Sequence, residues 1–479
     1  MAYKHGVYVN EIPTTITPPT SVDTVPVVFG TAPINLSKRS KAPVNEPVLC
    51  YTYAEAVEAF GYSNDWSFSL SEFIHSHFAL FAMSPVVLVN VLDPATHKTS
   101  VSDEAVTMVN GLATVKKQGI LKSSVVVKSN DGQTTYLLGT DYTLDYDDDG
   151  NLVIQRLAAG LIPSNATTLS VSYDKLNPAA VTSSDIIGGI DGSGNPKGLE
   201  LIDQVFPRFR MVPGMILAPG YSHEPAVGAV MVAKAGNVNG LFKAIALTDL
   251  PADQAYTDVA AWKESNNYTS ERQINTYPLV KLGDKTYHLS TQLAGVICAT
   301  DAAYTGIPYV SPSNQSLRAD SSVLADGTPL FLGPDQAAYL NGQGIVTALN
   351  FVGGWKAWGN RTGAYPANTD PKDAFIPVRR MMDWITNTVV LSYWQRLDGP
   401  ITRRLTEAVT DSLNLWLNGL TAIGALLGGR VEFRADENPQ TDIMDGIVRF
   451  HIYVTPPSPA REIDFIVEYD TSYLSTLAE

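Results

Sequence analysis

Each end of this chain carries a short segment with strand character, attached through a proline-rich stretch. Residues 6–12 are β-branched and aromatic, and prolines follow at positions 13, 18 and 19. At the other end, Ile463, Phe465 and Val467 alternate with acidic residues, behind a segment 455–459 that contains three prolines. Such alternation gives a strand one wet and one buried face. A lone strand is unstable in water, so each end is expected to pair with a sheet edge.

The sequence leaves two partners open for these arms. They either add strands to neighbouring subunits or join a sheet of their own chain. Proline-rich stretches hold the backbone extended and do not turn back as hairpins, which allows the arms to reach outward. We assign 1–20 to an N-terminal arm and 456–479 to a C-terminal linker and strand. The residues expected to carry the pairing are Val7, Tyr8, Val9, Ile12, Ile463, Phe465 and Val467.

Length and composition indicate a large folded protein. At 479 residues the chain exceeds one hydrophobic core, so two to four domains are expected. A hydrophobic content of 45% with 17% charged residues is typical of globular proteins and not of disordered ones. The net charge of -15 argues against nucleic acid as the main partner, because phosphate binding requires a basic surface.

Neither a membrane span nor a secretory signal is evident in the sequence. No apolar run approaches the ~20 residues that cross a bilayer, and residues 1–6 contain no apolar signal core. Cys50 and Cys298 lie far apart in apolar surroundings, which favours two buried thiols over a disulfide. We therefore expect a protein that stays in the cytosol where it is made, without membrane insertion.

The pattern along the chain changes three times. Strand, helix and strand signals over 21–93 predict the first part of an α/β core. Short strands every eight to twelve residues over 94–185 predict an inserted β-sandwich or barrel. The α/β pattern resumes over 186–344, and 345–455 combines strands with two amphipathic helices. The predicted fold class is thus α/β plus β, with a core built from both N- and C-terminal parts and strand-forming arms at both termini.

No motif in the sequence predicts a catalytic, cofactor or metal site. Residues 145–150 imitate the start of a calcium loop, but Arg156 stands where a carboxylate is required, so a hairpin turn is favoured. His75 and His77 lie in a helical stretch, where they do not share a face. The adjacent Ser222, His223 and Glu224 do not make a triad, because triads are assembled in space.

One region is locally basic in this acidic chain. Between residues 378 and 409, five arginines face only Asp383, Asp398 and Glu407. This excess suggests an acidic partner surface, although a solvated helix face with internal pairs is the common alternative. Arg361, among aromatic residues, is favoured as a stacking residue that holds a loop. The arginines of the basic region are Arg379, Arg380, Arg396, Arg403 and Arg404.

With these pieces together, the chain resembles contractile tail sheath proteins of bacteriophages and related injection particles. The matching segments lie at 6–12, 28–32, 358–362, 378–380 and 424–429, and in the Pro456-Pro457-x-Pro459 tail with its final strand. The resemblance covers the whole chain and is weakest over the β insertion. A static shell or tube protein remains compatible with the residues alone. A secreted hydrolase or carbohydrate-binding protein fits less well, since it requires a signal peptide or a catalytic set.

The resemblance implies a mechanical function without a cofactor. Sheath rings stack helically around an inner tube and rearrange to a shorter, wider state that drives the tube through an envelope. It implies that both arms add strands to adjacent subunits, and that a helix of the 345–455 region faces the tube. Arg403 and Arg404 are the preferred tube-facing residues because they lie off the apolar stripe of their helix; Arg379 and Arg380 are second. The implied partners are further copies, the inner tail tube protein, and baseplate and tail terminator proteins; the implied location is the virion, assembled in the bacterial cytoplasm.

Overall fold

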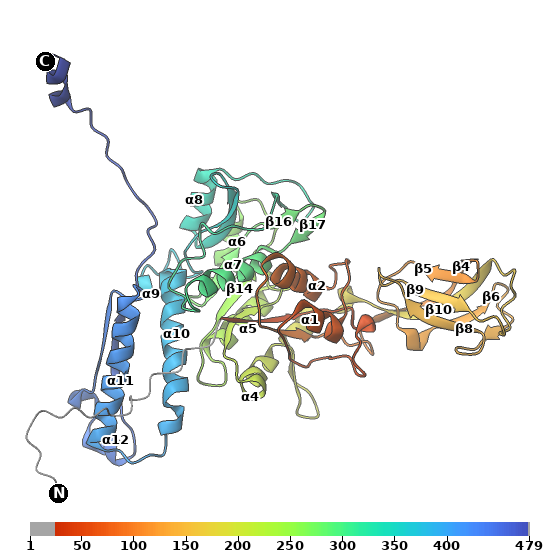
Figure 1. Cartoon of the computed structure of the whole chain (residues 1–479), viewed down its shortest axis with the longest axis horizontal. Coiled ribbons are helices and arrows are strands. Elements are labelled where there is room, and N and C mark those ends of the chain that lie inside the picture. Colours follow the sequence, from red (N-terminus) through yellow and green to blue (C-terminus); the bar gives the residue numbers. More distant parts are fainter. Residues whose placement is uncertain (1–23, 478–479) are drawn as a thin grey trace, which may run out of the picture.

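The structure, a computed structural model, describes residues 24–477 and has three regions in a row (Figure 1). An α/β body occupies the centre. A domain of β-strands extends from one side, and a unit built on long helices lies on the other. The C-terminal arm leaves this helical unit and runs away from the rest of the molecule.

The body is organised on one eight-stranded sheet that unites distant parts of the sequence. Its order is β2-β3-β1-β13-β14-β15-β19-β20, and the strands from β3 to β19 run parallel. The edge strands β2 and β20 are antiparallel to their neighbours. The strands are Val48–Cys50, Val86–Asn90, Val25–Gly30, Pro213–Leu217, Ile245–Asp249, Gln273–Thr276, Ile345–Asn350 and Trp355–Trp358.

Helices cover both faces of this sheet, as the sequence of its strands requires. Every residue of β1 (VPVVFG) and of β3 (VVLVN) is buried, which is typical of parallel strands enclosed on two sides. Around the sheet lie α1 (Tyr53–Phe60), α2 (Ser69–Ile74) with a π-helical turn (His75–Leu80), α3 (Ser183–Ile187), α4 (Val205–Phe209), α5 (Pro225–Gly236), α6 (Val259–Ser265), α7 (Leu289–Ala303), α8 (Pro334–Gly342) and α9 (Pro371–Ala374). Two small sheets, β11-β12 (Gly189–Ile190, Pro196–Lys197) and β17-β16-β18 (Lys285–Tyr287, Leu279–Leu282, Ser321–Val323), complete the body.

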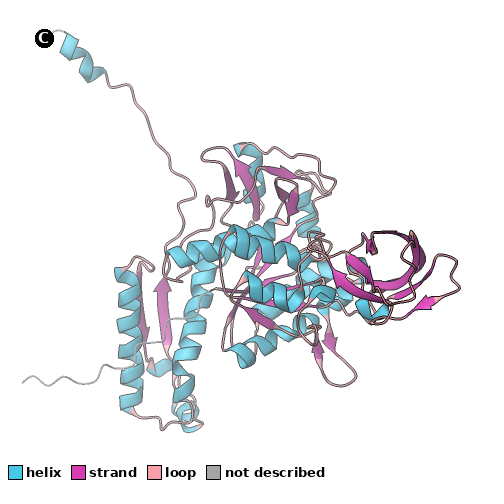
Figure 2. Cartoon of the chain, turned by 45° about the vertical axis from the view of Figure 1, so that its right-hand side comes forward, coloured by secondary structure: helices cyan, strands magenta, loops and turns pink. Residues whose placement is uncertain are grey.

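The insertion is a single seven-stranded sheet curled into a nearly closed barrel (Figure 2). Its order is β7-β6-β10-β4-β5-β9-β8, and a bridge between Leu138 and Tyr142 brings the two ends of the order together. Its interior is a separate hydrophobic cluster that includes Val127, Leu152 and Val171. The strands are β4 (Lys98–Val109), β5 (Leu112–Val115), β6 (Val126–Ser129), β7 (Thr135–Tyr136), β8 (Tyr142–Tyr146), β9 (Leu152–Arg156) and β10 (Thr168–Leu176).

The aspartate-rich stretch before Gly150 forms the predicted hairpin turn. It connects β8 and β9, which pair antiparallel. The carboxylate of Asp147 accepts hydrogen bonds from the backbone N–H groups of Asp149 and Asn151, at 3.1 and 2.8 Å. Gly150 has a φ of +78°, a conformation that glycine adopts without steric cost. These aspartates therefore stabilise a turn.

The third region, here called the C-terminal unit, packs two long helices against a β-hairpin. Helices α10 (Ile376–Tyr393) and α11 (Arg403–Ala422) enclose β21 (Gly428–Glu432) and β22 (His451–Thr455), and a short helix α12 (Gln440–Met444) lies between the strands in sequence. The hairpin lies between the two helices in Figure 2. Trp384 of α10 stacks on Trp416 of α11, with ring centroids 5.6 Å apart.

The boundary expected at residue 345 does not follow the sheet. Strand β19, which begins at Ile345, pairs parallel with β15 and antiparallel with β20, so residues up to Trp358 belong to the central sheet. The sequence-based division started a new region at Ile345 because the strand there is followed by an aromatic, turn-rich stretch and then two helices. In the structure that stretch is the turn of the β19-β20 hairpin at the sheet edge.

Candidate functional site

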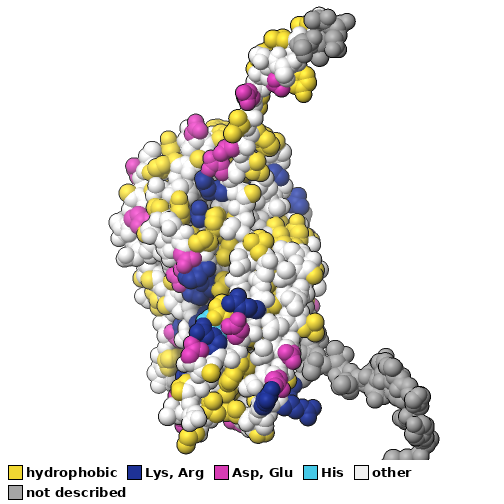
Figure 3. Space-filling view, turned by 90° about the vertical axis from the view of Figure 1, so that its left-hand side faces the viewer, with side chains coloured by type: hydrophobic (Ala, Val, Ile, Leu, Met, Phe, Trp, Pro, Cys, Tyr) yellow, Lys and Arg dark blue, Asp and Glu magenta, His cyan; other side chains and the backbone are white. Residues whose placement is uncertain are grey.

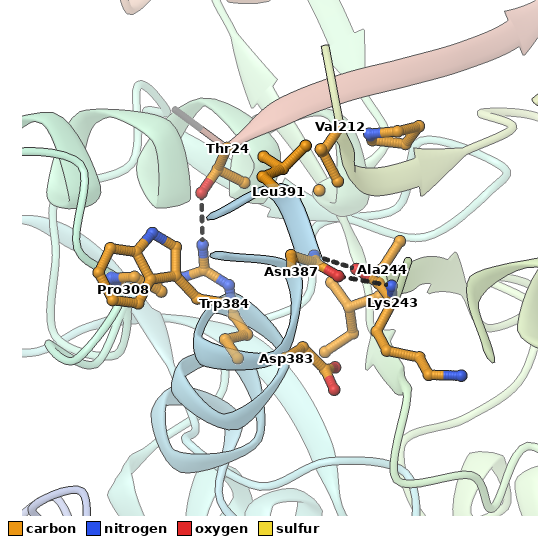
Figure 4. Close-up of a pocket in the computed structure, with 13 residues that line it drawn as sticks. Thr24, Val212, Lys243, Ala244, Pro308, Asp383, Trp384, Asn387 and Leu391 are labelled. Atoms are coloured by element: carbon orange, nitrogen blue, oxygen red, sulfur yellow. Dashed lines mark hydrogen bonds between the residues drawn. The ribbon is translucent and has the colours of Figure 1, made fainter. Parts of the chain in front are cut away.

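Helix α10 is fastened to the body beside Thr24, which directly precedes β1. Arg380, which is 6% exposed, pairs with the buried carboxylate of Asp301 on α7. Its guanidinium also donates to the hydroxyl of Thr24 at 3.1 Å, and Thr24 donates to Asp301 at 2.5 Å. Figure 4 shows this contact to Thr24 at the edge of a small pocket between α10 and the sheet.

Further polar contacts hold α10 through Arg379, next to Arg380, and through Asn387, about two turns farther along. Arg379 pairs with Asp373 and Asp383, and Arg272 also pairs with Asp383, at 3.2, 2.7 and 3.0 Å. The side-chain amide of Asn387 accepts from the backbone N–H of Lys243 and donates to its C=O, as Figure 4 shows. Breaking one partner of a buried pair leaves an uncompensated charge, so this arrangement ties α10 to the body.

These contacts correct one part of the sequence-based expectation. Arg379 and Arg380 were second candidates for a tube-facing surface, but both are buried in ion pairs within the chain. Their acidic partners Asp301 and Asp373 lie outside the 378–409 window in which the charges were counted. The apparent basic excess of α10 is therefore neutralised by residues that the fold brings in from elsewhere.

Helix α11 has the amphipathic form that its sequence predicts. Val409, Leu413, Leu417 and Leu420 are buried against α10 and the hairpin, and the hydroxyl of Thr402 caps the first turn by accepting from the N–H of Leu405. Arg403 and Arg404 begin the helix and are both exposed. Arg403 forms an exposed i,i+4 pair with Glu407 at 2.7 Å, which raises the pKa of its guanidinium.

A hollow of about 500 Å³ opens where α10 passes into α11. Arg396 and Arg404 line it, together with Tyr393, Leu405 and Val409. No acidic side chain lines this hollow, and no ion pair within residues 24–477 joins either arginine. The hollow therefore presents two uncompensated cations at the end of the molecule that is farthest from the barrel (Figure 1).

The β21-β22 hairpin is a sheet of only two strands, so each strand has one edge that no other strand covers. On β21, the N–H and C=O of Val431 bond to the side-chain amide of Asn414 on α11, at 2.8 and 3.1 Å. On β22, Ile452 lies opposite Val431, so its N–H and C=O also point away from the partner strand. Within the described residues no hydrogen bond joins the outward groups of Ile452 or Val454. The edge of β22 is the more open one.

Charged side chains around the hairpin pair mainly with one another. Arg434 bonds to Asp436 and to the hydroxyl of Tyr453, which together raise the pKa of its guanidinium, and Arg449 pairs with Asp442. Figure 3 shows this face, with basic and acidic side chains intermixed and hydrophobic side chains between them. The surface thus has little net charge and offers both apolar and hydrogen-bonding contacts.

The C-terminal arm does not pair with any sheet among the described residues. The segment from 461 to 470 is exposed throughout and belongs to none of the sheets. Phe465, Ile466 and Val467 are 86%, 97% and 93% exposed. For this end, the alternative that the arm joins its own chain's sheet is wrong. The N-terminal candidates Val7, Tyr8, Val9 and Ile12 lie outside the described residues.

Other residues singled out in the sequence have structural roles. Arg361 stacks over the rings of Phe375 and Tyr365, at 3.7 and 4.3 Å from their centroids, which confirms its interpretation as a loop-holding residue. His77 is fully buried, and burial lowers its pKa to about 3. Ser222 donates to Asp249 in the core. Cys50 and Cys298 are free thiols; Cys50 is buried as expected, whereas Cys298 is only partly buried.

Over residues 24–477, no group of three or more His, Cys, Asp or Glu side chains is placed to hold a metal ion. Over the same residues, none of the helices combines the length and the apolar character that crossing a membrane requires.

Sequence reasoning missed two features of this site. The amide of Asn414 covers part of the edge of β21, a role that a lone asparagine on a helix does not reveal. After the strand-like segment the arm ends in a 3₁₀-helical turn, Thr471–Leu477. The loss of alternation after Tyr469, together with the absence of charged residues from 471 to 477, is the signal that could have revealed this turn.

Comparison with known proteins identifies similar full-length chains. No family model matches this chain. The tail sheath protein of Burkholderia phage BcepMu is 30% identical over 491 aligned positions, which span 99% of this chain and 98% of that protein. A putative prophage major tail sheath protein of Pseudomonas aeruginosa (strain UCBPP-PA14) is 28% identical over 326 positions, covering 66% and 80%.

Solved structures show the same fold. The sheath complex of the extracellular contractile injection system PVC, in its contracted state, superposes with a TM-score of 0.59 at 13% identity and covers 99% of both chains. The helical sheath of the anti-feeding prophage, also contracted, gives a TM-score of 0.59 at 16% identity and covers 97% of this chain and 99% of that one.

Proposed function

The chain belongs to the tail sheath protein family, as a structural subunit of a contractile tail sheath, and we propose that its C-terminal unit is where copies are joined. The relatives are structural proteins, and the chain has a structural function of the same kind. In this proposal, the C-terminal arm of each copy adds a strand to the β21-β22 sheet of a neighbour. The exposed apolar arm is the observation that carries the proposal.

Strand addition fits the chemistry of both partners. The arm presents Ile463, Phe465 and Val467 on one side, and these side chains are exposed in the single chain. The β22 edge offers unpaired backbone groups beside an open hollow lined by Met382 of α10 and by residues of both strands. Backbone hydrogen bonds supply the attachment in such pairing, and alternate side chains supply the specificity. The N-terminal arm is proposed to act in the same way on another copy.

Helical growth follows from arms that reach only other copies. A contact between two different surfaces of identical subunits continues indefinitely when its rotation does not close. The extended prolines between β22 and the strand segment allow the joined bodies to change their angle while the strand contact persists. We propose that this freedom permits contraction, in which the polymer shortens and widens around an inner tube and drives it through the target envelope.

The proposed contact with the inner tube uses the basic start of α11. Arg403 and Arg404 are exposed there, and Arg404 shares an otherwise uncharged hollow with Arg396. Charge pairs at a wet interface orient partners and separate at little cost. Arg404 is expected to contribute more than Arg403, because Arg403 is already paired with Glu407. The tube surface that meets this region would be acidic.

We also propose where the subunit acts and where it is assembled. The subunit would be part of a virion or similar particle, assembled in the bacterial cytoplasm, with baseplate and tail terminator proteins at the two ends of the sheath. Nucleic acid would not contact it, because the tube lies between.

Electron microscopy of the purified protein tests the polymer. Hollow tubes with helical order are expected, whereas closed shells would favour a static coat protein and monomers alone would contradict self-assembly. With tube protein added, Arg404→Glu should abolish extended tails while leaving self-assembly intact. Arg208→Glu, a half-exposed arginine on the body, is the matched control and should leave the tails unchanged. Normal tails with Arg404→Glu would place the tube contact elsewhere.

A further inference from the structure

The C-terminal arm has two chemically different parts. Residues 461–470 contain one basic and four acidic side chains, a net charge of -3, with apolar residues between them. Residues 471–477 contain no charged side chain and form the 3₁₀ turn, with Leu474 and Leu477 at 49% and 85% exposed. A strand that only needs to pair with a sheet edge does not need such an apolar end. This end has the composition of a segment that is buried elsewhere.

A hollow that suits this turn lies on the C-terminal unit. It measures about 550 Å³ and is lined mostly by apolar surface. Ile401, Phe433 and Ile443 supply hydrophobic side chains, and Thr406 and Thr410 supply the side of α11 between them. It lies on the face of α11 opposite the Arg396–Arg404 hollow. Thr402, before the first turn, lines both, but the residues of α11 itself that line the two are different and alternate along the helix. The two hollows can therefore take different partners.

The position of this apolar hollow relates it to the hairpin. Phe433 directly follows the end of β21, and Ile443 belongs to α12, which precedes β22. The hollow thus adjoins the end of the hairpin where β22 begins. The chain's own arm leaves from the opposite end, after Thr455, and runs away from the unit (Figure 1).

The prolines after β22 make it unfavourable for the arm to return to its own hollow. Pro456, Pro457 and Pro459 hold the chain extended at the place where a tight reversal would be required. A second copy has no such restriction. If its arm runs antiparallel to β22, it starts beside Thr455 and ends beside His451. The arm then continues past the sheet toward the hollow.

Lengths agree with this path. Strand β22 has five residues and measures ~17 Å at ~3.3 Å per residue. If Ile463 to Val467 face it, the turn begins four residues later, ~13 Å beyond the end of the strand at most. A reach of this length is enough to bring the turn to Phe433 and α12, which adjoin that end of the strand. Antiparallel pairing is also slightly more stable per residue than parallel pairing.

We propose that the terminal turn, Thr471–Leu477, of one copy docks in the hollow between α11 and α12 of a second copy. The docked turn fixes the direction of the donated strand as antiparallel to β22 and fixes its register. This inference rests on the proposed strand donation and adds to it a second attachment point. The uncharged turn is suited to a rim on which Arg403 and Glu407 already neutralise each other and Asp411 is the one further charged side chain in the lining.

Two truncations separate this inference from the proposal on which it rests. A chain that ends at Asp470 keeps the strand and loses the turn, and it should form tubes only at a critical concentration at least about tenfold higher, equivalent to ~1.4 kcal/mol. A chain that ends at Ala460 loses both parts and should form none. Tubes from the Ala460 chain would overturn strand donation. Failure of that chain, with wild-type assembly by the Asp470 chain, would overturn the docked turn alone.

Cross-linking tests the direction and the partner. Chains with Leu477→Cys are mixed with chains with Ile443→Cys and allowed to assemble, and oxidation should give disulfide-linked dimers. The matched control replaces Ile443→Cys with Leu427→Cys, an exposed residue at the other end of the hairpin. Dimers with Leu427→Cys and none with Ile443→Cys would show the opposite strand direction and overturn the inference. A cross-link confined to single chains carrying both Leu477→Cys and Ile443→Cys would overturn the second-copy assignment.

Discussion

The barrel and the C-terminal unit treat the edges of their sheets in opposite ways. The barrel curls seven strands until its first and last members nearly meet, and it encloses its own core. The C-terminal unit stops at two strands, and its chain continues into an exposed apolar arm. A closed sheet offers no edge for pairing, whereas an open one is a template for another chain. Under the proposed strand donation, one end of the molecule is self-contained and the other carries assembly.

The largest expected effect comes from removing the C-terminal arm, and removing the barrel is the comparison. Ending the chain at Ala460 should leave a folded monomer that forms no tubes, because about five backbone hydrogen bonds at ~1 kcal/mol each are lost along with the apolar contacts. Excising 94–178 with a short linker should leave assembly in some form. Electron microscopy and sedimentation measure the polymer, and circular dichroism checks the fold. Tubes without the arm, or a loss of all soluble protein without the barrel, would break the comparison.

The next prediction compares two arginines of the C-terminal unit, Arg380 in α10 and Arg403 in α11. Each is one of two adjacent arginines in the sequence. Arg380→Met leaves the carboxylate of Asp301 buried without a cation and should lower the free energy of unfolding by about 3–5 kcal/mol. Arg403→Met removes an exposed pair with Glu407 and should lower the free energy of unfolding far less, because solvent screens the pair. Urea denaturation measures both. Equal losses would show that α10 is not fastened to the body through Arg380.

A third pair of variants makes the same change in each region. Leu152→Ala in the barrel and Leu417→Ala in α11 both empty a fully buried site and should each cost about 2–5 kcal/mol. Their effects on assembly should differ: the barrel variant should form normal tubes, while the helix variant should assemble poorly, since Leu417 packs against the hairpin that is proposed to receive the arm. If the barrel variant alone impaired assembly, the barrel would be part of the subunit contact.

Much of the fold could be predicted from local sequence. Continuous apolar runs such as VPVVFG give buried parallel strands, and regular turn signals reveal the β insertion, because both patterns depend on neighbouring residues. The apolar stripe of α11 could likewise be predicted from its helical period. The boundary near residue 345 could not be predicted in this way, because β19 belongs to the central sheet only through its pairing with β15, about 70 residues earlier.

The candidate site was less predictable for the same reason. Arg403 and Arg404 are exposed as the helix period predicts, but Arg379 and Arg380 are buried in ion pairs. Arg379 pairs with Asp373, just outside the counted window, and with Asp383 inside it, whereas Arg380 pairs with Asp301, 79 residues away. Charge counted over a short window ignores such partners. The alternation that predicts a strand in the arm is a local pattern, whereas the terminal turn and the hollow that suits it required the structure.

The smallest expected effect compares acid sensitivity in the two regions. Burial raises the pKa of Glu104 in the barrel, but hydrogen bonds from Tyr173 and Lys117 outweigh it and hold the pKa below its ordinary value. A carboxyl group with a lowered folded-state pKa stabilises the fold fully above its unfolded pKa of ~4.3 and loses this contribution as the pH falls through the folded value. Glu104→Gln should therefore lower the free energy of unfolding by on the order of 1 kcal/mol at pH 7. It should also remove the part of the acid destabilisation below pH ~4 that comes from protonation of Glu104. Asp442→Asn, which removes an exposed pair with Arg449 in the C-terminal unit, is the control and should leave the acid unfolding of the barrel unchanged. Hydrogen exchange of the barrel strands between pH 7 and 3 measures the difference, and an acid response that Glu104→Gln does not alter would place the sensitive group elsewhere.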